Sequence, residues 1–81
     1  MVEQRIKEVI ASVMDIDLSE IGDNASPETI KVWDSIKQIS LILSLEEEFN
    51  IHFSDEQTLD LINFKIIMRT IENILNSTFN N

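Results

Sequence analysis

The sequence predicts an all-α protein: a small four-helix bundle with a long loop between the first two helices and a short third helix. Apolar residues recur every three or four positions along much of the chain, which is the spacing of one helix face. A stretch of acidic and turn-forming residues interrupts this pattern after the first helix. The longest strand-like pattern is Ile51–His52–Phe53, so no sheet is expected.

The first helix is expected from about Val2 to Met14, where charged residues separate the apolar positions of one face. These apolar positions are Val2, Ile6, Val9, Ile10 and Val13. The next stretch, from Asp15 to Pro27, is acidic and contains the only glycine and the only proline of the chain. Because glycine and proline interrupt regular structure, this stretch is predicted to be a loop, in which Ser26 and Pro27 can begin a helical turn.

The second helix is predicted to begin near Asp34 and Ser35. Its apolar side chains cover a broad face, which is typical of a central helix packed against several neighbours. The residues of this face are Ile36, Ile39, Ile42, Leu43, Leu45 and Phe49, and Leu41 widens it. Three consecutive acids, at positions 46–48, follow near the end of the helix.

Capping signals predict the last two helices. Ser54 and Gln57 have the spacing of a capping box, which indicates a short third helix from about Asp55 to Ile62. Asn63 is suited to cap the fourth helix. The residues of that helix expected to face the core are Ile66, Ile67, Ile71, Ile74 and Leu75.

Length and composition narrow the class of protein. The 81 residues are expected to form one domain, residues 1–81, with a small core, which disfavours an enzyme with an enclosed active site. The net charge of −9 argues against binding nucleic acid or an anionic membrane, and it favours partners with basic surfaces. Without cysteine, a secretory signal or a membrane-spanning apolar run, we expect a cytoplasmic monomer.

Ser35 has an ordinary structural interpretation. An Asp–Ser pair before a helix is typical of an N-cap, because side-chain oxygens there accept hydrogen bonds from free backbone N–H groups. Nucleophilic catalysis by Ser35 would require a base held by a third group. The only histidine, His52, is flanked by two apolar residues and is expected to point to solvent. A hydrolase triad is therefore not predicted.

The residues around Ser35 nevertheless resemble the acyl carrier protein family, which includes peptidyl carrier domains. Asp34–Ser35–Ile36 opens the central helix, where the family has Asp–Ser–Leu. The run Leu–Glu–Glu–Glu–Phe–Asn–Ile at residues 45–51 is similar to the run that closes the same helix in the family. The resemblance extends over essentially the whole chain, including the long loop and the short third helix.

The resemblance implies a non-catalytic carrier in which Ser35 bears a 4′-phosphopantetheine arm, transferred from coenzyme A by a separate phosphopantetheinyl transferase. The thiol of the arm would hold an acyl or aminoacyl group as a thioester, loaded by a ligase and presented to acyl-processing enzymes. Asp34 is then the motif partner that helps the transferase to modify Ser35. A phosphodiester at this position agrees with helix chemistry, because free N–H groups and the helix dipole favour an anion.

The same resemblance indicates surfaces for partner docking. Ile36 stands in the place of the motif leucine, and Glu46, Glu47 and Glu48 are expected to face basic partner surfaces. A solvated acidic face that keeps the chain soluble is the alternative interpretation of these three glutamates.

The sequence departs from the family pattern close to Ser35. Val32 stands where the family often has glycine, and Trp33 after it is expected to pack against the fold. Lys37 and Ser40 occupy positions that are acidic in many carriers of fatty-acid synthesis. This favours the enzymes of a specialised pathway as partners over the main fatty-acid synthase.

Other functions remain open at this point. An aminoacyl or peptidyl carrier would share the same arm, and an acidic helical adaptor without a prosthetic group would need the same helices. The stretch from Asp15 to Ser19 is similar to the start of an EF-hand loop. Its sixth position is Glu20 where glycine is needed, and its twelfth is Ser26 where glutamate is needed, so no metal site is predicted.

Overall fold

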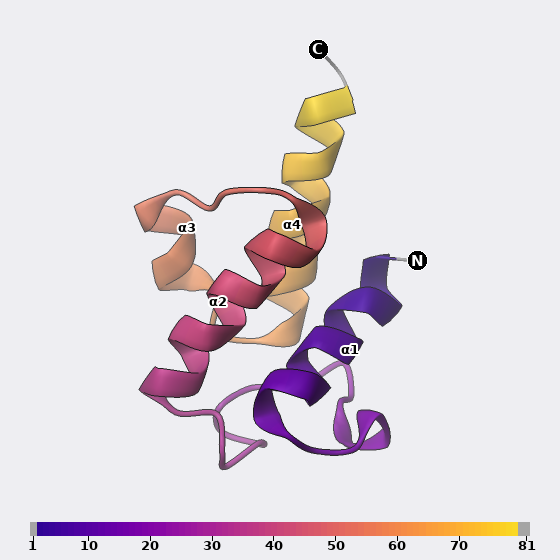
Figure 1. Ribbon diagram of the computed structural model, residues 1–81, viewed down its shortest axis with the longest axis vertical. Coiled ribbons are helices and arrows are strands. Elements are labelled where there is room, and N and C mark those ends of the chain that lie inside the picture. The colour runs from indigo at the N-terminus through magenta and orange to yellow at the C-terminus, as the bar shows by residue number, and fades with distance from the viewer. Residues whose placement is uncertain (1, 80–81) are drawn as a thin grey trace.

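The computed structural model describes residues 2–79, and this part of the chain contains helices and no strands (Figure 1). The elements are α1 (Val2–Met14), the 3-10 helix η1 (Leu18–Glu20), α2 (Ser35–Phe49), α3 (Asp55–Asp60) and α4 (Phe64–Phe79). The predicted all-α four-helix bundle, with its long first loop and short third helix, is thereby confirmed. None of these helices is long and apolar enough to cross a lipid bilayer within the described residues.

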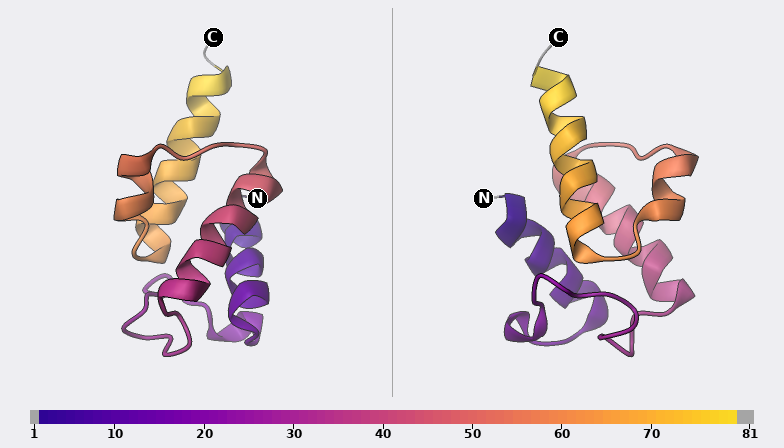
Figure 2. Two further views of the ribbon diagram at one scale, coloured as in Figure 1. Left: turned by 60° about the vertical axis from the view of Figure 1, so that its left-hand side comes forward. Right: turned by 180° about the vertical axis from the view of Figure 1, so that it is seen from behind.

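Helix α1 packs against both α2 and α4 and runs in the opposite direction to them (Figure 1). The connection between α1 and α2 closes the end of the bundle at which α2 and α4 begin (Figure 2). It is held there by a hydrogen bond of 2.9 Å from the Phe64 N–H to the Ala25 carbonyl. Its apolar side chains join the core, which explains why a stretch with so little regular structure keeps one path. The buried residues of this connection are Ile21, Ala25, Ile30 and Trp33.

The core lies between the three long helices. The fully buried residues include Ile6 and Ile10 of α1, Leu41 and Leu45 of α2, and Ile67 and Ile71 of α4. Helix α3 contributes no buried residue of its own. The chain on either side of α3 is anchored instead by Phe53 and Leu61, which are 2% and 0% exposed.

The broad core-facing surface predicted for α2 is wrong in part. Leu41, Leu45 and Phe49 are buried, whereas Ile36, Ile39 and Leu43 are 74%, 62% and 61% exposed. At 3.6 residues per turn these two sets lie on opposite sides of the helix. Helix α1 covers the first side. The second side stays open, because α3 is too short to cover it and buries no residue of its own.

The predicted caps are present. Ser54 Oγ accepts a hydrogen bond of 3.1 Å from the Gln57 N–H, and Gln57 Oε1 accepts one of 2.8 Å from the Ser54 N–H. Asn63 Oδ1 accepts a hydrogen bond of 2.9 Å from the Ile66 N–H at the start of α4. Helix α3 ends at Asp60, before the predicted Ile62, because Leu61 leaves helical geometry to enter the core.

Lys7 joins α1 to the loop that follows it. Its Nζ lies 3.1 Å from Asp23 Oδ1 and 3.4 Å from Glu3 Oε2. The hydrogen bond to Asp23 is the main cause that raises the pKa of Lys7 above its ordinary value of 10.5. The ammonium also lies 5.2 Å from the centre of the Phe64 ring, so it links α1, the loop and the start of α4.

Candidate functional site

Ser35 is the first residue of α2, and Asp34 is its N-cap. Asp34 has extended backbone geometry, with φ −105° and ψ −172°, and its Oδ1 accepts a hydrogen bond of 2.9 Å from the Lys37 N–H. The Asp34 carbonyl accepts the first helical hydrogen bond, 2.8 Å from the Gln38 N–H. The cap is therefore complete without the hydroxyl of Ser35. That hydroxyl is exposed and makes no hydrogen bond to any described residue.

The start of α2 is suited to an anion. The backbone N–H groups of Ser35 and Ile36 precede the helical hydrogen bonds and have no acceptor among the described residues. With the positive end of the helix dipole they favour negative charge beside the Ser35 hydroxyl. The Asp34 carboxylate accepts the Lys37 N–H and not these two groups.

Trp33 and Gln38 hold the loop before Ser35 in place. Trp33 is only 3% exposed, so its predicted packing role is confirmed. Its Nε1–H donates a hydrogen bond of 2.6 Å to Gln38 Oε1, and Gln38 Nε2 donates one of 2.6 Å to the Leu61 carbonyl. The role of Gln38 was not predicted from the sequence. A buried tryptophan needs an acceptor for its N–H group, and this requirement could have pointed to a nearby polar side chain such as Gln38.

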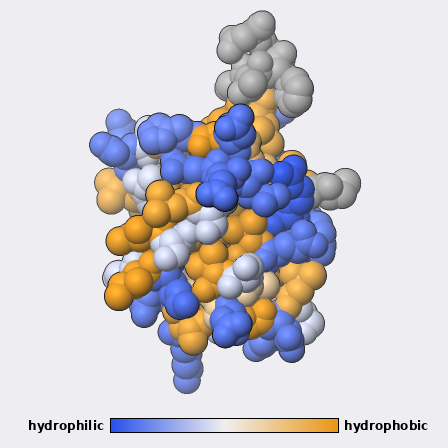
Figure 3. All heavy atoms as spheres, viewed as in Figure 1, coloured by the Kyte–Doolittle hydropathy of each residue, from blue (hydrophilic) through white to orange (hydrophobic). Residues whose placement is uncertain are grey.

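A groove opens beside Ser35, between the start of α2 and α3. Its volume is about 520 Å³, and most of its lining is apolar. The lining residues are Pro27, Trp33, Asp34, Ser35, Gln38, Ile39, Thr58, Leu59 and Ile62. Figure 3 shows hydrophobic residues over the first half of α2, whereas hydrophilic residues cover the last turns of α2.

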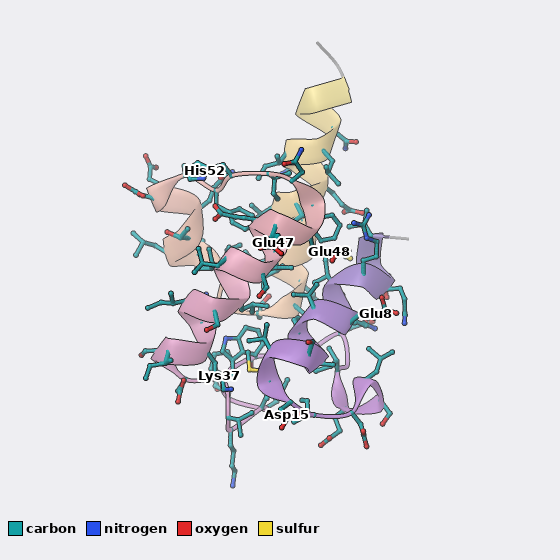
Figure 4. The ribbon with its side chains drawn as sticks, in the orientation of Figure 1. Glu8, Asp15, Lys37, Glu47, Glu48 and His52 are labelled. Atoms are coloured by element: carbon teal, nitrogen blue, oxygen red, sulfur yellow. The ribbon has the colours of Figure 1, made fainter. Side chains whose placement is uncertain are left out.

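Lys37 does not face the Ser35 hydroxyl. Its Nζ donates a hydrogen bond of 3.2 Å to the Val13 carbonyl in the last turn of α1 (Figure 4). The Lys37 side chain therefore connects α2 to α1 and does not extend freely into solvent. The first half of α2 still carries no acid, since its first acidic residue is Glu46.

The three glutamates proposed for docking lie in three different environments. Glu46 Oε2 accepts a hydrogen bond of 2.9 Å from the Phe53 N–H and lies 3.2 Å from His52 Nδ1. Glu48 Oε2 lies 3.0 Å from Nη2 of Arg5, whose guanidinium also covers the Phe49 ring. Glu47 is exposed and has no ionic partner among the described residues (Figure 4). The sequence placed these acids together, but the structure leaves only one without a partner.

His52 is far from Ser35. Its side chain is 90% exposed, as predicted, and its partner Glu46 is about three helical turns, or roughly 16 Å, along α2 from Ser35. Within the described residues, Ser35 has no base of the kind that a hydrolase requires. No group of three or more His, Asp or Glu residues in the described part of the chain is arranged to hold a metal ion.

Comparison with known proteins agrees with this geometry. The family model described as a phosphopantetheine attachment site matches residues 4–65. An acyl carrier protein of Buchnera aphidicola subsp. Schizaphis graminum is 35% identical over 75 residues, which cover 93% of this chain and 91% of the relative. This chain belongs to the acyl carrier protein family. The acyl carrier protein of Helicobacter pylori is 33% identical over 67 residues, 83% of this chain and 86% of the relative. That of Buchnera aphidicola subsp. Acyrthosiphon pisum is 41% identical over 56 residues, 69% of this chain and 70% of the relative.

An acyl carrier protein is a non-catalytic carrier with a covalently attached 4′-phosphopantetheine. When attached, this group supplies the thiol that a cysteine-free chain lacks. The start of α2 fits the phosphodiester end of such a group, because it offers an exposed hydroxyl that is not used in capping. Two backbone N–H groups without acceptors lie at the same place.

Proposed function

We propose that Ser35 is the attachment site of the 4′-phosphopantetheine and that the chain presents an acyl group, held as a thioester, to biosynthetic enzymes. The observation that carries this proposal is the exposed Ser35 hydroxyl at the first residue of α2, free because Asp34 alone caps the helix. The names of the relatives favour an acyl group over an aminoacyl group as the cargo.

The residues around Ser35 have distinct roles in this proposal. Asp34 holds the first turn of α2 in helical geometry, so that the hydroxyl of Ser35 stays exposed to a phosphopantetheinyl transferase. The backbone N–H groups of Ser35 and Ile36 favour the negative charge of the resulting phosphodiester. Trp33 and Gln38 fix the path of the loop and so limit the positions that the hydroxyl can occupy.

Partner enzymes are proposed to contact Ile36, beside the attachment site, and the acids at 46–48 through basic surfaces. Glu47 is the most available of these acids, because Glu46 and Glu48 already have partners within the chain. The absence of acids before Glu46 in α2 supports the enzymes of a specialised pathway as partners, because charges at the rim of an interface influence partner choice.

The test of the proposal is an intact-mass measurement on the folded chain, incubated with coenzyme A, Mg²⁺ and a broad-specificity phosphopantetheinyl transferase. We expect the wild-type chain to gain the mass of one phosphopantetheine, and Ser35→Ala to gain none. Ser40→Ala is the matched control, because Ser40 is also an exposed serine of α2. It should gain the same mass as the wild type.

A wild-type sample without any prior modification that gains no mass with several transferases would overturn the proposal. Ser35 would then be an ordinary residue of a helix start, and an acidic adaptor would become the better account of the chain. A gain of mass in Ser35→Ala would place the attachment at another residue.

A further inference from the structure

Gln38 holds the chain on both sides of Ser35. It follows Ser35 by three residues in α2, whereas Trp33 precedes Ser35 by two residues in the loop. Gln38 Oε1 accepts a hydrogen bond of 2.6 Å from Trp33 Nε1–H, and Gln38 Nε2 donates one of 2.6 Å to the Leu61 carbonyl. A contact between side chains therefore closes the segment that contains Ser35, in addition to the Asp34 cap.

The two partners of Gln38 are anchored in the core. Leu61, the residue at which α3 ends, is 0% exposed, and Trp33 is 3% exposed. Apolar burial has no preferred direction, so packing by itself allows the indole ring to shift within its site. A hydrogen bond depends on distance and angle, so the contact with Gln38 fixes Nε1 relative to α2 and to the Leu61 carbonyl.

The two hydrogen bonds require one donor and one acceptor in the side chain at position 38. An indole N–H only donates and a backbone carbonyl only accepts. The glutamine amide supplies both groups, with its oxygen toward Trp33 and its nitrogen toward Leu61. A methionine of similar length has no N–H or O–H donor and only a weak acceptor. Substitution of Gln38 by methionine therefore removes both contacts while it keeps most of the volume of the side chain.

We propose that Gln38 is a positioning residue for attachment at Ser35. Through Trp33 it sets the place of the Ser35 hydroxyl, and so the rate at which the phosphopantetheine is transferred. This inference rests on the proposed function, because it takes Ser35 as the residue that is modified. Gln38 itself does not touch the reacting atoms.

The transfer depends on the exact place of one oxygen atom. A bond forms between Ser35 Oγ and phosphorus, the pyrophosphate bond of coenzyme A breaks, and adenosine bisphosphate leaves. The hydroxyl proton passes to a base of the transferase. A displacement of about 1 Å at a reacting group can lower a rate by about 100-fold, so a small shift of the loop before Ser35 is expected to slow the transfer.

The test measures kcat and KM for the unmodified chain in the transferase reaction, followed by intact mass. We expect Gln38→Met to lower kcat about tenfold and to change KM less than about twofold, because the hydroxyl is displaced while the docking surface is kept. Ile71→Val is the matched control for lost stability. Ile71 is fully buried in α4 and does not line the groove beside Ser35. This variant should leave kcat unchanged.

Trp33→Phe tests the other end of the same hydrogen bond, because it removes the N–H donor and keeps an aromatic ring. Trp33 is 3% exposed, so a lower kcat in this variant comes from the loop and not from a lost contact with the transferase. If both residues act through one hydrogen bond, the double variant should lose about as much rate as Gln38→Met alone. Losses that multiply would mean that the two residues act separately, and the inference would be wrong.

A measurement without the transferase follows the contact directly. Trp33 is the only tryptophan of the chain, so its indole N–H gives a single NMR signal. We expect this N–H to exchange with D₂O at least tenfold faster in Gln38→Met than in Ile71→Val, because only the first variant removes its acceptor. Equal exchange in the two variants would show that Gln38 does not hold the indole.

The failure of this inference and the failure of the proposed function are distinguishable. A wild-type chain that is never modified would overturn both. Normal modification of the wild type, with the same kcat for Gln38→Met and Ile71→Val, would overturn the inference alone. A higher KM with unchanged kcat in Gln38→Met would make Gln38 a contact of the transferase, and the positioning role would again be wrong.

Discussion

At the scale of single residues, Gln38 connects three segments that meet beside Ser35. Its amide oxygen accepts the Trp33 Nε1–H and its amide nitrogen donates to the Leu61 carbonyl, each at 2.6 Å. Trp33 precedes Asp34 in the loop, and Leu61 ends the segment that contains α3. One side chain therefore satisfies two polar groups that are largely removed from water.

We expect Gln38→Ala to lower the free energy of unfolding by about 1–3 kcal/mol, because it leaves the Trp33 N–H and the Leu61 carbonyl without partners. Urea unfolding followed by the fluorescence of Trp33, the only tryptophan of the chain, measures this change. Gln4→Ala is the matched control, because Gln4 is an exposed helical glutamine. An equal, small effect of both substitutions would mean that the two hydrogen bonds contribute nothing to stability.

At the scale of elements, α1 and α2 cap each other. Neither helix has a basic residue in its own last turn. A positive charge at that end would interact favourably with the carbonyl groups that have no helical partner. Lys37 at the start of α2 donates to the Val13 carbonyl at the end of α1. Arg5 at the start of α1 donates a hydrogen bond of 2.8 Å from Nη2 to the Glu48 carbonyl at the end of α2. The antiparallel pair is thus fastened at both ends.

Lys37→Met, which keeps a long apolar stem, should lower the free energy of unfolding by about 1 kcal/mol through the loss of this hydrogen bond and of the charge near the helix end. Chemical denaturation detects a change of this size. Lys65→Met is the comparison, because Lys65 is exposed and has no partner among the described residues. If the two variants lose stability equally, the contact with α1 is not the cause.

At the scale of the whole molecule, acidic side chains outnumber basic ones. There are 15 acidic and 6 basic side chains. Three of the basic residues, Arg5, Lys7 and Lys37, have partners that hold the fold together. Exposed ion pairs contribute little, so we expect the net charge of −9 to destabilise this small fold through self-repulsion.

The melting temperature should therefore rise by several degrees between about 0.01 M and about 0.1 M NaCl, where the Debye length falls from about 30 Å to about 10 Å. Thermal unfolding by circular dichroism checks this. MgCl₂ at equal ionic strength should give a similar rise if screening is the cause. A melting temperature that stays flat or falls with NaCl would show that self-repulsion is not significant.

Local signals in the sequence were enough to predict most of the fold. The apolar positions from Val2 to Val13 placed α1, the Asp34–Ser35 pair placed the start of α2, and the capping box of Ser54 and Gln57 placed α3. Each signal comes from residues that are close together in the sequence. It can therefore be recognised without knowledge of the tertiary contacts. Asp34 and Ser35 were recognised in the same way as a helix start, whereas their role in attachment came from the resemblance to the acyl carrier protein family.

Which apolar side of α2 enters the core was decided by the tertiary structure. The sequence by itself determined an all-α chain, the position of Ser35 at a helix start and the excess of acidic charge. Leu41 and Leu45 form one apolar side of α2, and Ile36, Ile39 and Leu43 form another, so helical periodicity fits both. Only the packing of α1 against α2, beside an α3 that buries no residue, left the second side open next to Ser35. The roles of Lys37, Gln38 and the acids at 46–48 were decided in the same way, because their partners lie in segments distant along the chain.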